Sequence, residues 1–137
     1  MQLNKQLYEQ LLTQAASNPR LRQALDLRTE ATESLNPSNH KDSSQRLLNA
    51  LLPGTVVPIH RHTSTTETAI ILYGCIDEIY YDNDGNETSR HTLHAGDGLQ
   101  IPVGKFHTIE VHEPSILLEV KDGKYEPAKP EDILSTK

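Results

Sequence analysis

The sequence predicts an all-β barrel or sandwich that carries a short helical extension at its N-terminus. From Ser44 onward, short apolar runs alternate with turn residues and no helical pattern separates them. Before that point, apolar residues recur at helical spacing. The chain has 137 residues, which is enough for one hydrophobic core and too few for two domains that are cored separately.

The N-terminal segment, residues 1–43, is expected to be a helical extension and loop and not an independent domain. An amphipathic helix of about three turns is predicted by the apolar residues Leu3, Leu7, Leu11, Leu12 and Ala15. It ends before Asn18-Pro19. A second, shorter helical piece is predicted around Leu25, and the polar stretch 29–44 predicts a loop. The apolar stripe of the first helix can cover a sheet of its own chain or of a neighbouring subunit, and the sequence leaves both open.

The barrel is expected to span residues 44–125, with a C-terminal tail over residues 126–137. Its strands are predicted by six apolar runs: Leu47–Leu52, Ala69–Tyr73, Ile76–Tyr81, Leu99–Ile101, Ile109–Val111 and Ile116–Val120. The sequence Asp82-Asn83-Asp84-Gly85-Asn86 predicts a hairpin, and further turns are indicated at Pro53-Gly54 and Pro102-Val103-Gly104.

Composition excludes several classes of function. The net charge of −6 argues against binding to a nucleic-acid backbone, which needs a basic face. No apolar run approaches the roughly 20 residues of a membrane span, and the N-terminus lacks a signal-peptide pattern. Cys75 is the single cysteine, so no intrachain disulfide can form and a reducing compartment is expected. We therefore expect a cytoplasmic protein that binds neither nucleic acid nor membrane.

Three histidines and a glutamate stand out as a candidate metal site. His60 and His62 are two residues apart, so both side chains leave the same face of an extended strand. Glu67 begins the next apolar run, and His107 begins a later one. Imidazole and carboxylate ligands together suit one divalent transition metal ion, namely Fe, Mn, Ni, Co or Zn, and do not distinguish among them. A His-x-His pair alone is weak evidence, because exposed strands often carry one.

The framework around these residues resembles the two cupin motifs. The first reads Gly54, five residues, His60-x-His62, four residues, Glu67, six residues and Gly74. The second reads Gly96, five residues, Pro102-x-Gly104, two residues and His107. The resemblance implies a cupin double-stranded β-helix, or jelly-roll barrel, with the metal held inside by His60, His62, Glu67 and His107. The chain departs from the second motif at Val111, where Asn is common.

A closer resemblance, over roughly the whole chain, is to the WbuC-type cupin metalloproteins. It is carried by the segments Asn18–Arg22, Ser44–Gly54, His60-Arg61-His62, Asp82–Gly85, Ile101-Pro102 and Leu118–Tyr125. Thr63 stands where that family has Pro after the His-x-His pair. The family is associated with bacterial surface polysaccharide synthesis, so the resemblance implies a sugar or sugar-nucleotide type of ligand.

Four further residues are candidates for contact with a ligand. Arg46 shares a strand face with Leu48 and is either an anion clamp in the barrel mouth or an end-of-strand residue that reaches solvent. Lys105, next to the second motif's histidine, is a candidate guard of the entrance or a solvated lysine. Tyr80 and its neighbour point to opposite faces, so at most one lines a cavity. Glu119 is a candidate general base or a partner that orients a ligand histidine, unless it simply pairs with a cation.

The function expected is a metal-dependent enzyme that acts on a small sugar or sugar nucleotide by isomerisation or epimerisation, with Glu119 as base. An Fe(II)-dependent dioxygenase and a non-catalytic cupin that binds a small ligand remain alternatives. The partner expected is a small molecule, either anionic or neutral, and a homodimer is an open alternative to a monomer.

Overall fold

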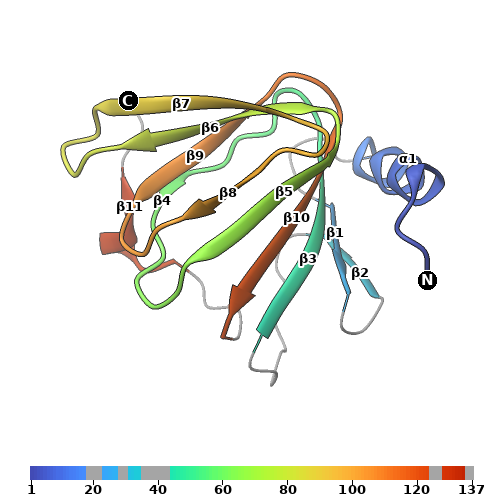
Figure 1. Cartoon of the computed structure of the whole chain (residues 1–137), viewed down its shortest axis with the longest axis horizontal. Helices are drawn as coiled ribbons and strands as arrows, with labels where there is room; N and C mark the ends of the chain where they lie inside the picture. The colour runs from blue at the N-terminus through green and yellow to red at the C-terminus, as the bar shows by residue number, and fades with distance from the viewer. Residues whose placement is uncertain (18–22, 28–30, 35–43, 124–127, 135–137) are drawn as a thin grey trace.

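A computed structural model describes residues 1–17, 23–27, 31–34, 44–123 and 128–134 of the chain. Two antiparallel sheets face each other, and a helix lies outside one of them (Figure 1). The first sheet has the order β2-β1-β3-β10-β5-β8, and its strands span, in that order, Ala31–Ser34, Gln23–Asp26, Ser44–Leu51, Ser115–Asp122, Glu67–Tyr73 and Gly98–Ile101. The second has the order β11-β4-β9-β6-β7, and its strands span Ile133–Leu134, Ile59–His60, Phe106–Val111, Cys75–Tyr81 and Glu87–His94. The all-β architecture predicted from the turn spacing is confirmed.

The inner faces of the two sheets enclose one apolar core. Its buried members are Leu51, Ala69, Ile71, Ile76, Leu93, Ile101, Val111 and Leu117. Leu51, Ile71 and Leu117 lie on neighbouring strands β3, β5 and β10, near the end of the barrel where Gly74 turns the chain. At Gly74 the φ angle is 90°, and an added Cβ would lie 2.4 Å from the carbonyl oxygen of Pro114, so this turn requires glycine. One end of the barrel is therefore closed by packed side chains.

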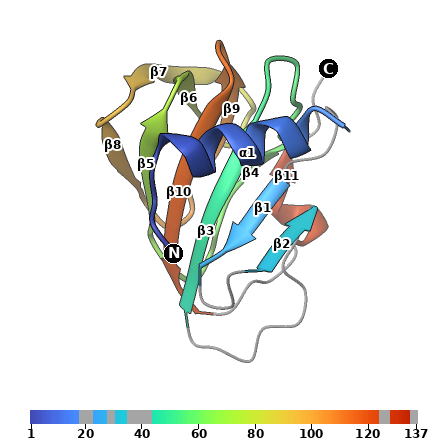
Figure 2. The same ribbon diagram turned by 90° about the vertical axis from the view of Figure 1, so that its right-hand side faces the viewer.

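Helix α1 (Lys5–Ala15) covers the outer face of the six-stranded sheet (Figure 2). The side chain of Asn4 caps it by accepting a hydrogen bond of 3.0 Å from the backbone N–H of Leu7. A second apolar cluster joins the helix to the sheet: Tyr8, Leu11, Ala15, Leu25, Leu48, Ala50 and Ile116. The helix therefore buries its apolar stripe on its own chain.

The strands β1 and β2 correct two predictions for the N-terminal segment. Residues 23–26 form a strand and not a helical piece, and residues 31–34 form a strand within the predicted loop. Leu25 pairs with Leu48 of β3 and is 1% exposed beneath the helix. A helix this short is costly to nucleate, whereas as a strand this segment pairs its backbone with β3 on one side and with β2 on the other. The predicted break at Asn18-Pro19 and the remainder of the loop, residues 35–43, lie outside the described residues.

Two other strands differ in how visible they are in the sequence. The predicted hairpin joins β6 to β7, and Asp82 accepts hydrogen bonds from the backbone N–H groups of Asp84 and Asn86. Strand β7 has no apolar run because it is an edge strand on which Leu93 alone is buried. The segment predicted as a tail contains a 3₁₀ turn (Pro130–Asp132) and β11, which pairs with β4.

In the described part of the chain, no helix has the length and apolar character needed to cross a membrane.

Candidate metal centre

Two histidines of the five-stranded sheet and a third from the loop after β4 converge on one point inside the barrel. His60 ends β4 and lies directly opposite His107 of β9, and His62 follows two residues after His60. The ring centroids of His60 and His107 are 4.4 Å apart, and those of His60 and His62 are 5.0 Å apart. One nitrogen from each ring lies within 4.8 Å of the other two. This proximity makes the three rings a candidate ligand set for a single metal ion.

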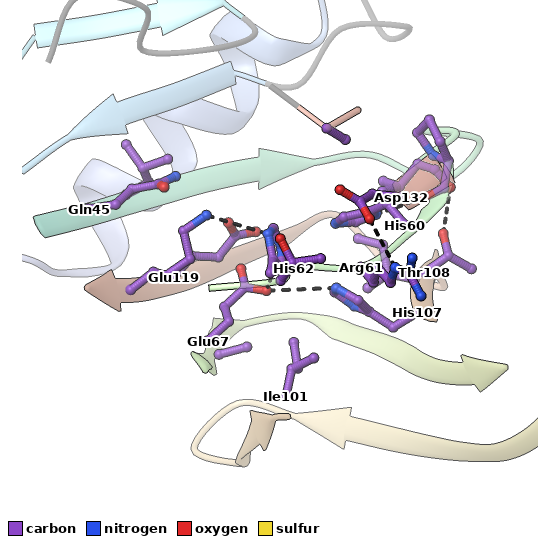
Figure 3. Close-up of a pocket in the computed structure, with 18 of the residues that line it drawn as sticks. Gln45, His60, Arg61, His62, Glu67, Ile101, His107, Thr108, Glu119 and Asp132 are labelled. Atoms are coloured by element: carbon purple, nitrogen blue, oxygen red, sulfur yellow. Dashed lines mark hydrogen bonds and ion pairs between the residues drawn. The ribbon is translucent and has the colours of Figure 1, made fainter. Parts of the chain in front are cut away.

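Glu67 reaches the histidines from the opposite sheet. It is the first residue of β5, is 6% exposed, and points its carboxylate across the barrel (Figure 3). Its Oε2 lies 3.4 Å from Nε2 of His62 and 3.8 Å from Nε2 of His107. Among the described residues, neither Oε2 of Glu67 nor Nε2 of His107 has a hydrogen-bond partner. Buried polar atoms without partners are costly, and a cation between them would satisfy both.

Two of the rings are held so that their inward nitrogens carry lone pairs. Nδ1 of His60 lies 2.8 Å from the carbonyl oxygen of Pro58, which can only accept, so Nδ1 donates and Nε2 is left free. Nδ1 of His107 lies 2.5 Å from Oε1 of Glu78, a carboxyl that is 1% exposed. A carboxylate behind a histidine fixes the ring's orientation and raises its basicity toward a metal. The groups that lie behind the histidines therefore also suit a bound metal ion.

The protonation states favour the same use. Burial lowers the pKa of His60 to about 3 and that of His62 to about 4, and burial also lowers the pKa of His107. All three rings are thus neutral near pH 7, as metal ligands must be. Burial raises the pKa of Glu78 to about 9, so this carboxyl is protonated near neutrality unless a cation on the far side of His107 favours its charged form.

The histidines line a pocket of about 480 Å³ that lies between the two sheets. The six-stranded sheet contributes the inward residues of β3 and β10: Gln45, Leu47, Asn49, Leu117, Glu119 and Lys121. The C-terminal segment contributes Asp132 and Ile133 at the opposite wall. A space of this size accommodates a small organic molecule in addition to an ion.

Of the four residues predicted to contact a ligand, the structure places one in the pocket lining and three outside it. Glu119 lines the pocket, since it alternates in phase with Leu117 on β10. Arg46, Tyr80 and Lys105 do not line it. Arg46 does share a face with Leu48, as predicted, but that face is the outer one beneath α1, and its own side chain is exposed. Both faces of β3 are apolar, so alternation alone could not tell the inner face from the outer.

Tyr80 and Lys105 contact each other outside the pocket. Nζ of Lys105 lies 5.7 Å from the centroid of the Tyr80 ring, and Tyr80 packs against the apolar core. This distance is compatible with a cation–π contact. The contacts that the structure shows for Tyr80 and Lys105 are packing contacts near the second motif, and neither residue lines the pocket.

The C-terminal segment 128–134, called the strap below, lines one side of the pocket and is held there by contacts between Arg61 and Asp132. Nε of Arg61 lies 2.9 Å from Oδ1 of Asp132, and the backbone N–H of Arg61 donates to the carbonyl oxygen of Asp132 at 3.0 Å. The guanidinium also lies 4.7 Å above the ring of Phe106. Asp132 is 6% exposed, so this ion pair is largely shielded from solvent. The residue between the two histidines therefore anchors the strap.

Several pocket residues were missed by the sequence analysis. Glu78 is the clearest, and its signal was a carboxylate in phase with Ile76 and Tyr80 on an otherwise apolar face of β6. Lys121 was detectable as the next inward position after Glu119. Gln45 carried no signal, because its inward direction depends on which face of β3 lies inside the barrel.

Comparison with known proteins identifies a family and a fold. A family model described as a domain of unknown function, DUF6016, matches residues 3–93. Curated protein sequences include no match to the chain. Among solved structures, the capsular polysaccharide assembling protein CapF from Staphylococcus aureus is similar over 75% of this chain and 30% of its own, with 20% identity and a TM-score of 0.57.

Two other solved structures support the same fold. Oxalate decarboxylase from Bacillus subtilis, described with Mn(II) centres, is 21% identical over 77% of this chain and 26% of its own, with a TM-score of 0.55. A sugar phosphate isomerase of the cupin superfamily from Silicibacter pomeroyi is 21% identical over 79% of this chain and 62% of its own, with a TM-score of 0.56. The chain spans only 24% to 28% of the first four of these structural relatives, which are CapF and oxalate decarboxylase. The fold of the chain is that of a cupin.

Proposed function

The chain belongs to the DUF6016 family, and we propose that it is a metal-dependent cupin enzyme that moves a proton on a small sugar or sugar-nucleotide substrate. The observation that carries the proposal is the convergence of three histidine nitrogens and the Glu67 carboxylate. Two of these buried atoms, Oε2 of Glu67 and Nε2 of His107, have no hydrogen-bond partner among the described residues. The resemblance to the WbuC-type cupins, and the names of CapF and of the sugar phosphate isomerase among the structural relatives, support a carbohydrate substrate.

The donor set fits one divalent transition metal, with His60, His62, Glu67 and His107 as its ligands. Such an ion supplies Lewis acidity to neighbouring oxygens of a bound substrate. Four protein ligands would leave two positions of a six-coordinate ion for a ligand in the pocket. A ligand that offers two adjacent oxygens, such as a hydroxyl beside a carbonyl, matches this arrangement.

In this proposal, Glu119 is the residue that moves the proton. It lines the same pocket as the histidines, and its charge raises the pKa of His60, His62 and His107 against the larger lowering caused by burial. In the proposed step, its carboxylate takes a proton from the carbon next to a carbonyl, and the C–H electron pair moves toward the carbonyl oxygen. Return of the proton to the former carbonyl carbon, with transfer of the neighbouring hydroxyl proton to the former carbonyl oxygen, gives isomerisation. Return of the proton to the opposite face of the carbon that lost it gives epimerisation.

The metal half of the proposal is tested by elemental analysis of untagged protein purified without chelators. We expect about one equivalent of a single transition metal in the wild type and its loss in His107→Ala. His94→Ala, whose ring is exposed and outside the pocket, is the matched control and should keep the metal. A wild type that takes up no ion after reconstitution would overturn the proposed centre.

The catalytic half is tested with metal-loaded protein in D₂O and a panel of aldose and ketose phosphates. Nuclear magnetic resonance should show deuterium entering next to the carbonyl of the substrate, and Glu119→Gln should abolish this exchange while retaining the metal. Turnover that requires both Fe(II) and O₂ would instead establish the dioxygenase. Tight binding of a sugar without any exchange or conversion would establish a binding module.

A further inference from the structure

A row of three polar side chains crosses the inner face of the six-stranded sheet beside the histidines. Lys121 of β10 lies directly opposite Glu67 of β5 on one side and Gln45 of β3 on the other. Residues opposite each other in antiparallel strands project from the same face and are close neighbours. All three line the pocket, so the proposed metal ligand Glu67 has Lys121 as its neighbour, and Lys121 in turn has Gln45.

Gln45 is buried without using its acceptor. Its side chain is 5% exposed, and Oε1 has no hydrogen-bond partner among the described residues. A buried carbonyl oxygen without a hydrogen-bond partner destabilises the fold, so folding alone poorly explains the inward position of Gln45. An amide in this setting can accept from a hydroxyl group, which can also accept in return from the amide nitrogen. Gln45 therefore matches a hydroxylated ligand in the pocket.

Lys121 brings the positive charge in this row. Its Nζ lies 3.4 Å from Nδ1 of His62, a contact in which Nδ1 must accept because an ammonium only donates. An ion held by Nε2 of His62 places the proton on Nδ1, so two donors would then face each other. The lysine would have to turn to another acceptor, and a ligand that reaches the metal is adjacent.

We propose that Lys121 and Gln45 form a second subsite of the pocket, which selects ligands that carry an oxyanion, either carboxylate or phosphate, next to hydroxyl groups. Lys121 binds the oxyanion and Gln45 accepts a hydrogen bond from a hydroxyl. The inference rests on the proposed function in taking Glu67 and the histidines as the metal site beside it. It narrows the substrate class from sugars in general to acidic or phosphorylated ones.

The test is calorimetric titration of metal-loaded protein with three probes that share one carbon chain: sorbitol, gluconate and sorbitol 6-phosphate. We expect at least one of the two anions to bind the wild type more tightly than sorbitol. Lys121→Met should weaken that anion by about tenfold or more, since hydrogen bonds to charged groups are the strong ones, and should leave sorbitol unchanged. Gln45→Leu should weaken every probe that binds by about twofold to tenfold.

The matched controls remove the same groups elsewhere. Lys5→Met removes an exposed ammonium on α1, and Gln100→Leu removes an exposed amide on β8. Both should bind the probes as the wild type does. Metal content and the near-ultraviolet circular dichroism of each variant are measured in parallel, so that a loss of binding can be separated from a loss of the ion or of the fold.

The outcomes separate this inference from the proposed function. Metal-loaded wild type that prefers neither anion over sorbitol overturns the subsite and leaves the metal centre standing. Loss of metal from folded Lys121→Met would show that the lysine supports His62, and would also overturn the subsite. If the wild type holds no metal, the proposed function fails, and the same titrations decide the subsite: anion binding that depends on Lys121 supports it, and its absence overturns it.

Discussion

The two faces of strand β3 differ in the kind of side chain that they bury. On the outer face, Leu48 and Ala50 are almost completely buried against α1 and Ile116, with no polar atom among them. On the inner face, Gln45 and Asn49 are equally buried, yet Oε1 of the first and Nδ2 of the second have no partner in the described structure. Close packing stabilises the outer face, whereas the inner face retains groups that packing alone would disfavour.

This contrast distinguishes residues that hold the fold from residues that serve the site. A substitution on the outer face should change stability and leave the pocket's chemistry intact. A substitution of one of the two inward polar residues, Gln45 or Asn49, should do the reverse, whereas Leu51 on the same inner face belongs to the apolar core. The following predictions are arranged from the largest expected effect to the smallest.

The largest effect is expected for Leu48→Ala on the outer face. The side chain is 0% exposed beneath the helix, so truncation removes buried methyl groups and leaves a cavity. We expect the free energy of unfolding to fall by about 2–5 kcal/mol, measured by denaturant titration. The folded fraction should keep its full metal content. Metal loss from the folded fraction would show that the two faces are coupled.

A smaller effect, on metal affinity, is expected for Glu78→Gln behind His107. The amide keeps the size of the carboxyl but cannot take the charge that a bound cation favours on the far side of the ring. We expect affinity for the ion to fall by about 10-fold to 100-fold, measured by competition with a chelator, while the fold is retained. An affinity equal to that of the wild type would show that Glu78 does not orient the histidine.

Asn49→Leu on the inner face should change stability only slightly and in the favourable direction. The substitution replaces an amide that is 2% exposed, and whose Nδ2 has no partner among the described residues, with a larger apolar side chain that can extend into the adjoining pocket. We expect the free energy of unfolding to stay the same or rise by about 1 kcal/mol in thermal or denaturant melts. A loss of several kcal/mol would place Asn49 among the residues that hold the fold.

The smallest net effect is expected for pH, because the lowered pKa values of His60, His62 and His107 are opposed by the raised pKa of Glu78. Burial holds the pKa of His60 near 3 in the folded chain, so the unfolded chain takes up more protons below its ordinary value of about 6.5. This contribution to stability is fully present above that value and is lost as the pH falls toward 3. Glu78 acts in the opposite sense, because its folded pKa is raised to about 9: its contribution is present below about 4.5 and is lost as the pH rises toward 9.

Thermal melts of metal-free protein check this balance in two variants. In His60→Asn, the loss of stability on acidification from about pH 7 to about pH 5 should be smaller than in the wild type. In Glu78→Gln, the loss on going from about pH 7 to about pH 9 should be smaller. Parallel profiles for wild type and both variants would contradict the assignment of these two groups.

Local patterns in the sequence were sufficient for the amphipathic helix, for most of the strands and for the four residues around the metal centre. These features depend on periodicity, on turn chemistry and on spacing along the chain, all of which operate over a few residues. The strand around Leu25 was mistaken for a helical piece because its partner, the edge of β3, lies more than twenty residues away along the chain. The polar strand β7 was visible only through the hairpin that precedes it.

The sequence by itself determined the kind of fold, and its resemblance to the two cupin motifs brought His60, His62, Glu67 and His107 together as one candidate metal site. The tertiary structure decided everything that depends on which face of a strand lies inside. It placed Arg46 outside and Gln45 inside, brought Glu78 behind His107, and set Lys121 between Glu67 and Gln45. The reason is physical: alternation assigns residues to two faces, but only the packing of α1 and of the second sheet makes one face the exterior and the other the pocket.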